Sequence, residues 1–206
     1  MSVVCERECK QVVESSLEKG MTYESYIEMV NDLAKSNGTT GVDQSEDRVV
    51  YTSLNQRRMK RWNKTLKVSE VVRESIEKLN KKYTWLVLTE SWCGDAAHVL
   101  PVINKVAELS ENVDLKVLLR DENPELMSNF LTNGAESIPK LVMIDTESGQ
   151  VVDTYGSRPK VLTDMVKEYK ELHGKLTPEF KEDIQVWYNK DKGQTILNEL
   201  VDLVKK

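Results

Sequence analysis

The most constraining feature of this chain is the alternation of strand and helix patterns between residues 84 and 173. Short apolar runs rich in strand formers alternate with segments in which apolar residues recur at helical spacing. In chain order they predict strand, helix, strand, helix, strand, strand and helix over residues 84–90, 94–110, 113–119, 124–130, 141–145, 151–155 and 160–172. Helical crossovers imply parallel strands, and the tight turn at 146–150 implies an antiparallel hairpin. We therefore predict an α/β fold with a mixed β-sheet flanked by helices.

Helical patterns also lie on both sides of this region. Before it, helices are predicted over residues 7–19, 23–36, 48–66 and 69–79, and after it over 178–188 and 194–204. In the third of these, the side chains expected to face inward are Tyr51, Leu54, Met59, Trp62 and Leu66. We expect residues 1–83 to form an N-terminal helical extension that packs on the core, 84–173 to form the core, and 174–206 to add C-terminal helices.

Composition and charge narrow the class of protein. The 206 residues carry a formal net charge of −5, which gives no general reason to expect nucleic acid as a partner. Residues 1–20 have several charges and no long apolar stretch, so no signal peptide and no membrane span are expected. Three cysteines without regular spacing do not make a disulfide framework. We expect a protein of a reducing, bacterial-type cytoplasm.

One cysteine stands where the first predicted strand turns into the following helix, in the sequence Trp92-Cys93-Gly94-Asp95-Ala96. A thiol at such a junction faces the unpaired N–H groups and the positive dipole end of the helix, which favour the thiolate. This geometry is typical of a reactive cysteine. Ala96 occupies the position where a redox pair would have its second sulfur.

Residues 84–173 resemble the thioredoxin superfamily. The resemblance rests on the strand–cysteine–helix junction at Cys93, on Pro101 eight residues later within the helix, and on Ser137-Ile138-Pro139 before the third strand, which matches the family's cis-proline. The motif is also similar to that of a bacterial thioredoxin-like group with a Trp-Cys-Gly-Asp signature and helical additions. The resemblance implies that Cys93 is the catalytic residue and that the residues around a bound substrate are Trp92, Gly94, Asp95, Ile138 and Pro139.

The chain departs from ordinary thioredoxins at three positions. Ala96 removes the local dithiol, and Val87 stands where the family has a buried acid that helps proton transfer. Asp95 replaces the usual proline, and its negative charge opposes the effect of the helix dipole on Cys93. The sequence leaves open which of these two effects prevails.

Two functions remain compatible with these residues. A lone thiolate can attack a disulfide of a protein or small molecule, but a second thiol must then release the product. Cys93 would act in this way with an external thiol, and a low-molecular-weight thiol as co-substrate is the only cofactor that we expect. The alternative is a redox-inactive thioredoxin fold that binds a protein or peptide.

The other cysteines and the histidines suggest lesser roles. Cys5 and Cys9 share one face of the first predicted helix, so either could resolve Cys93, although two ordinary, partly buried thiols explain them as well. With His98 and His173 as the only histidines, no zinc set can be assembled, and we predict no metal. We expect His98 on the surface and His173 at a helix end.

The only concentrated basic segment spans residues 57–64, with five cations around Met59 and Trp62. Such a segment could contact phosphates or an acidic partner. The spacing of Met59, Trp62 and Leu66 equally fits an amphipathic helix whose basic face is simply solvated.

Overall fold

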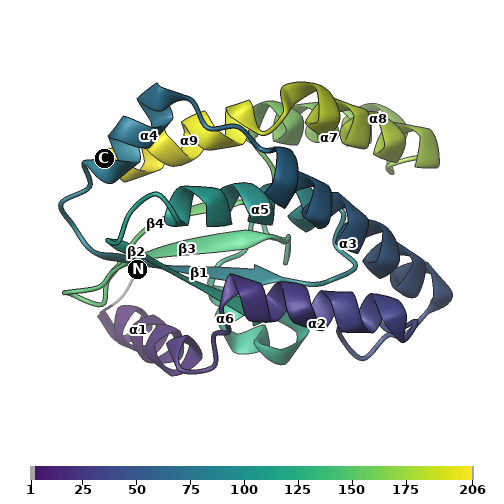
Figure 1. Ribbon diagram of the computed structural model, residues 1–206. Helices are drawn as coiled ribbons and strands as arrows, with labels where there is room; N and C mark the ends of the chain where they lie inside the picture. Colours follow the sequence, from purple (N-terminus) through teal and green to yellow (C-terminus); the bar gives the residue numbers. More distant parts are fainter. Residues whose placement is uncertain (1–2, 206) are drawn as a thin grey trace.

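The fold is built on a four-stranded mixed sheet, seen in a computed structural model that describes the backbone of residues 3–205 and the side chains of residues 9–205 (Figure 1). The strands lie in the order β2-β1-β3-β4. They are β1 (Tyr83–Thr89), β2 (Val113–Leu119), β3 (Lys140–Asp145) and β4 (Val151–Gly156). β1 is parallel to β2 and antiparallel to β3, and β3 and β4 form an antiparallel pair. The predicted mixed sheet is confirmed.

Helices cover both faces of this sheet. The described helices are α1 (Val3–Leu17), α2 (Tyr23–Lys35), α3 (Glu46–Thr65), α4 (Glu70–Glu77), α5 (Ala96–Ala107), α6 (Pro124–Asn129), α7 (Lys160–His173), α8 (Pro178–Asp191) and α9 (Gln194–Val204), with a 3₁₀ turn at Arg120–Glu122. Figure 1 shows α5 over one face, with α4, α9, α7 and α8 beyond it, and α1 and α6 on the opposite face. None of the helices in the described part is long and apolar enough to span a membrane.

The central strand β1 explains why both faces must be covered. All seven of its residues are buried, and alternate side chains point to opposite faces. Trp85 and Val87 belong to the larger apolar cluster, which includes α5 and the later helices. Leu86 and Leu88 belong to a smaller cluster that α1 and α6 complete.

The N-terminal half of α3 buries other side chains than those expected. Met59 and Trp62 are buried, but Tyr51, expected to face inward, is 41% exposed. Thr52 and Asn55 face inward instead, because this half of α3 packs on the polar turn after β1. There the Thr52 hydroxyl lies 2.8 Å from the Ser91 hydroxyl, and the Asn55 amide donates to the Ser91 carbonyl.

His98 corrects a second expectation, because it is buried rather than on the surface. The indole N–H of Trp62 on α3 donates to its Nδ1 at 2.8 Å, and its Nε2 lies 2.7 Å from Gln185 Oε1 on α8. Since Nδ1 accepts, Nε2 carries the proton and donates to Gln185. The ring also stacks on Tyr188 of α8 at 4.4 Å. One neutral imidazole on α5 therefore joins α3 to α8.

The end of β4 lies unusually close to the chain before β3. Gly156 pairs with Lys140 and has φ of +115°, and a Cβ at this position would collide with the backbone carbonyl of Pro139. The Ile138–Pro139 and Gly156–Ser157 peptide bonds are both cis. Glycine is thus required where β4 passes the proline loop.

Replacing Gly156 by alanine should therefore destabilise the fold by about 2–4 kcal/mol, because both the dihedral angle and the collision oppose it. Chemical denaturation of the two proteins measures the difference. Gly174→Ala is the matched control, since Gly174 also has positive φ (+74°) but no atom within 4 Å of the added methyl group. The control should lose about 1 kcal/mol. Equal losses in both variants would contradict the role of the close approach.

His98 should make stability depend on pH. Burial lowers the pKa of His98 to about 3, from 6.5 in the unfolded chain. Its stabilising contribution is therefore complete above pH 6.5 and is lost as the pH falls toward 3, with a total on the order of a few kcal/mol. Urea denaturation from pH 7 to pH 4 should show a smaller decline for His98→Gln than for the unaltered protein. Parallel declines would show that His98 is not the group responsible.

Candidate functional site

The candidate site lies where β1 gives way to α5. After β1 the chain turns, with the Cys93 N–H donating to the Glu90 carbonyl at 3.1 Å, and α5 begins at Ala96. Cys93 is 8% exposed. Its thiol donates to the carbonyl of Ile138 at 3.3 Å, and the Ala96 N–H donates to its sulfur at 3.4 Å. The sulfur is thus held between the start of the helix and the residue before cis-Pro139.

The surroundings of Cys93 favour the thiol over the thiolate. Burial raises the pKa of Cys93 to about 12, and the nearby Asp95 carboxylate adds to the effect. The backbone N–H groups of Ala96 and Asp95, and the guanidinium of Arg158, lower this pKa but do not compensate. The helix start thus favours the thiolate as expected, but burial and the Asp95 carboxylate outweigh its effect on the pKa.

Asp95 is itself held by residues from distant parts of the chain. Arg158, in the loop between β4 and α7, donates from Nε to Oδ1 at 3.0 Å and from Nη2 to Oδ2 at 2.6 Å. The Tyr188 hydroxyl on α8 donates to Oδ1 at 2.9 Å. A bidentate arginine and a tyrosine fix both oxygens of this carboxylate. Asp95 thereby connects the start of α5 to the end of the sheet and to the C-terminal helices.

Trp92 forms a half-exposed rim beside the cysteine. The guanidinium of Arg48 lies 4.3 Å from the centre of the indole ring, and that of Arg120 lies 5.0 Å from it. These distances are those of cation–π contacts. The indole N–H is buried and has no hydrogen-bond partner within the described part of the chain.

A buried polar network supports the turn before Trp92. The Thr40 hydroxyl donates to the carboxylate of Glu90, and the Asp121 N–H donates to the same carboxylate at 2.9 Å. The Ser91 N–H donates to Thr40 Oγ1 at 2.9 Å, and the Thr39 hydroxyl lies 3.2 Å from the Ser91 hydroxyl. Burial raises the pKa of Glu90. The network ties the loop before α3 to the end of β1.

The sequence did not predict this network, because a buried acid was considered only at position 87. Val87 is fully buried in the larger apolar cluster. The usable signal was the pair Glu90-Ser91 at the end of an otherwise apolar strand, together with the threonines of the 37–47 loop.

The structure brings the six predicted site residues to one place. The loop of Ile138 and Pro139 reaches Cys93 through the Ile138 carbonyl, and Trp92 and Asp95 flank the cysteine in the chain. Gly94 faces two helices, since a Cβ there would lie 3.8 Å from the side chains of Arg58 on α3 and Gln185 on α8. Ala96 is buried beside the sulfur in the smaller apolar cluster.

The structure describes the side chain of one of the two remaining cysteines, Cys9. Cys9 is half-buried on α1 and packs against the apolar cluster that contains Cys93. The side chain of Cys5 lies outside the described residues. His173 lies at the exposed end of α7, where its ring contacts that of Tyr169 at 4.2 Å.

Two solved structures share the fold of this chain. A solved structure of a protein of unknown function from Pseudomonas aeruginosa matches with a TM-score of 0.62 and 14% identity, over 90% of this chain and 92% of that one. An HIV epitope scaffold matches with a TM-score of 0.60 and 14% identity, over 90% and 93% of the two chains. At this identity the likeness shows the fold alone. No curated protein matches the chain.

The family is shown by sequence. A family model described as thioredoxin matches residues 41–170, well over half of the chain. The match begins before α3, so it includes two helices that precede the sheet as well as the sheet itself. With the cysteine, the cis-proline and the mixed sheet in their places, the chain belongs to the thioredoxin family.

Proposed function

We propose that this chain exchanges disulfides through the single thiol of Cys93 and that an external thiol completes each cycle. The observation that supports the proposal is the position of the Cys93 sulfur, 3.4 Å from the Ala96 N–H and 3.3 Å from the Ile138 carbonyl next to cis-Pro139. A backbone N–H aimed at the sulfur stabilises the anion that attacks a disulfide. The proline loop beside it offers main-chain groups to an extended substrate.

The exchange requires two displacements. Cys93 loses its proton and attacks one sulfur of a substrate disulfide, so that a Cys93–substrate disulfide forms and the other sulfur leaves as a thiolate that takes up the proton. A low-molecular-weight thiol then loses its proton and attacks the substrate sulfur of the mixed disulfide, so that a disulfide between this thiol and the substrate forms and the Cys93 sulfur leaves as a thiolate that takes up the proton. Ala96 cannot perform this second step. The proposed cycle therefore suits a reducing cytoplasm, where such thiols are abundant.

The raised pKa of Cys93 also supports a second candidate, a redox-inactive binding module. A pKa of about 12 leaves only a minute thiolate fraction at neutral pH, and no second sulfur follows at position 96. His98 is engaged by Trp62 and Gln185 and is not available as a base for the thiol. In this candidate Cys93 is a packed side chain beside the binding surface.

Intact mass spectrometry distinguishes the two candidates. A Cys5→Ser/Cys9→Ser variant, incubated with an oxidised low-molecular-weight thiol at pH 8, should gain one adduct, which added thiol should remove. The same protein with Cys93→Ser should gain none. If no adduct forms even on prolonged incubation, the exchange proposal fails and the binding module remains. A loss of two hydrogens that occurs in the protein with all three cysteines but not in its Cys93→Ser variant would instead identify Cys5 or Cys9 as the resolving thiol.

Asp95 should hold back the reactivity of Cys93. Asp95→Asn removes the negative charge but keeps an oxygen for Tyr188 and Arg158, so the thiol pKa should fall and alkylation at pH 8 should become several-fold faster. In the unaltered protein the alkylation rate should still be rising at pH 10. Glu199→Gln is the matched control, because Glu199 also accepts from a tyrosine, Tyr155, but does not affect Cys93. Equal rates in Asp95→Asn and the control would contradict this role.

A further inference from the structure

A stripe of unpaired positive charge lies on α3, away from the thiol chemistry. Arg57, Lys60, Arg61 and Lys64 follow one another at i, i+3, i+4 and i+7, so they share one face of the helix. All four are exposed. This basic stripe stands on a protein whose formal net charge is −5.

Several exposed cations on other helices form ion pairs, whereas Lys170 on α7 and Lys181 and Lys190 on α8 form none within the described residues. On α1, α4 and α7, exposed cations lie within 4 Å of a carboxylate one turn away, as in Lys10–Glu14, Lys78–Glu74 and Lys160–Asp164. In the described structure no member of the basic stripe forms such an ion pair. The partners recorded for Arg57 and Arg61 are uncharged: Arg57 donates to the Ser53 carbonyl, and Arg61 donates to the Asn189 side chain.

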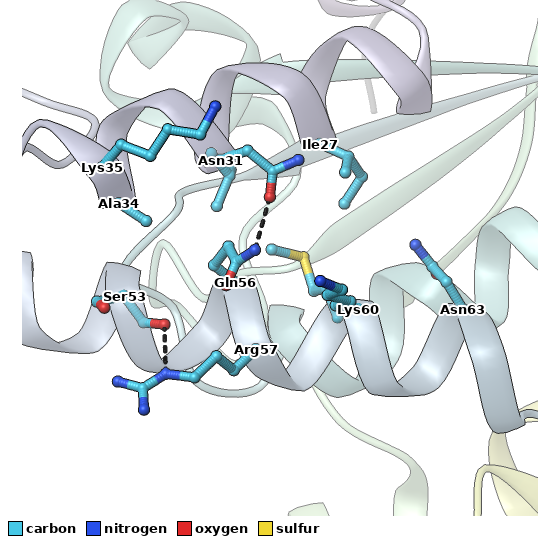
Figure 2. A pocket seen from close by; sticks show the side chains of 11 residues that line it. Ile27, Asn31, Ala34, Lys35, Ser53, Gln56, Arg57, Lys60 and Asn63 are labelled. Atoms are coloured by element: carbon cyan, nitrogen blue, oxygen red, sulfur yellow. Dashed lines mark hydrogen bonds between the residues drawn. The ribbon is translucent and has the colours of Figure 1, made fainter.

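Two hollows border the basic stripe. The first, of about 560 Å³, lies between α2 and α3 and has aliphatic residues in its wall; Figure 2 shows Ile27 and Ala34 directed from α2 toward α3, and the Gln56 amide bonded to Asn31 across the gap. The second, of about 640 Å³, lies beside the end of α3 and includes Trp62 and Val68.

The charge around these hollows has one sign. Arg57 and Lys60 line the first hollow together with Lys35, whose ammonium is paired with Asp32 at 2.9 Å, and Lys67 and Lys192 join Arg61 at the second. Neither lining contains an aspartate or a glutamate. A neighbouring hollow of about 320 Å³ is lined by three glutamates, Glu24, Glu28 and Glu108, with Lys105. The positive character is therefore local to the basic stripe.

We propose that the basic stripe and its two hollows bind an acidic, amphipathic segment of a partner protein. Carboxylates of such a segment would meet the four cations, and its apolar side chains would enter the hollows. From residue 57 to residue 64 the helix rises by about 10 Å, which matches two turns of a bound helix. The same length spans only about three nucleotides of a single strand. The hollow walls offer aliphatic groups and the buried ring of Trp62, whereas base stacking needs exposed rings. A protein segment therefore fits better than a nucleic acid.

Fluorescence anisotropy tests the proposal with defined probes. The first probe is a labelled helical peptide of about four turns with glutamates on one face and leucines on the other. It should bind saturably, and its affinity should fall as salt is raised. Arg57→Glu/Lys60→Glu should weaken binding by about tenfold or more. The control Lys175→Glu/Lys181→Glu makes the same change of charge at exposed positions outside both hollows and should bind as the unaltered protein does.

Three outcomes would overturn the proposal. They are the absence of saturable binding, equal binding of a peptide with glutamine in place of glutamate, and tighter binding of a single-stranded oligonucleotide or of anionic lipid vesicles. Circular dichroism of each variant confirms that it is folded. Because the stripe does not include Cys93, Cys93→Ser should bind the peptide unchanged, so this test and the test of disulfide exchange can fail independently.

Discussion

The buried contact of Asp95 with Arg158 and Tyr188 is the interaction on which the site depends. Asp95 is adjacent to Gly94 in the chain and two residues from Cys93, so the position of its carboxylate fixes the start of α5. Its charge needs a partner at this depth, and Arg158 supplies a bidentate one. The same charge opposes ionisation of the thiol. A group that stabilises the fold at this point therefore also makes the cysteine less reactive.

This contact explains how the family's site has changed in this chain. Ordinary thioredoxin chemistry needs a low thiol pKa and a second sulfur, and here Asp95 and Ala96 alter both requirements within the first turn of α5. The main-chain elements remain in place, with the Ala96 N–H and the Ile138 carbonyl on either side of the sulfur. These main-chain groups lie beside the sulfur, while burial and Asp95 favour a protonated thiol.

The sequence predicted the sheet and the grouping of the candidate site residues because both depend on local patterns. The strands appear as apolar runs, and Cys93 and Pro139 stand next to them in the chain. The role of His98 could not be read in this way, since its partners Trp62 and Gln185 lie 36 and 87 residues away. Asp95 was visible, but its effect on Cys93 depends on burial by α8 and on Arg158, 63 residues distant. Tyr51 was misplaced because helical spacing does not reveal that the neighbouring turn is polar.

The contacts of the His98 imidazole determine which helices must accompany the sheet if a shorter part of this protein is to fold. A fragment confined to the sheet and its immediate helices would leave Nδ1 and Nε2 of His98 and the Asp95 carboxylate without the groups from α3 and α8 that satisfy them. Such a fragment would also expose to water the apolar surface that Met59 of α3 and Ile184 and Tyr188 of α8 cover. Recombination could therefore not replace the flanking helices freely by unrelated ones. Trp62, His98 and Gln185 would have to be inherited together, although they lie in three separate segments of the chain.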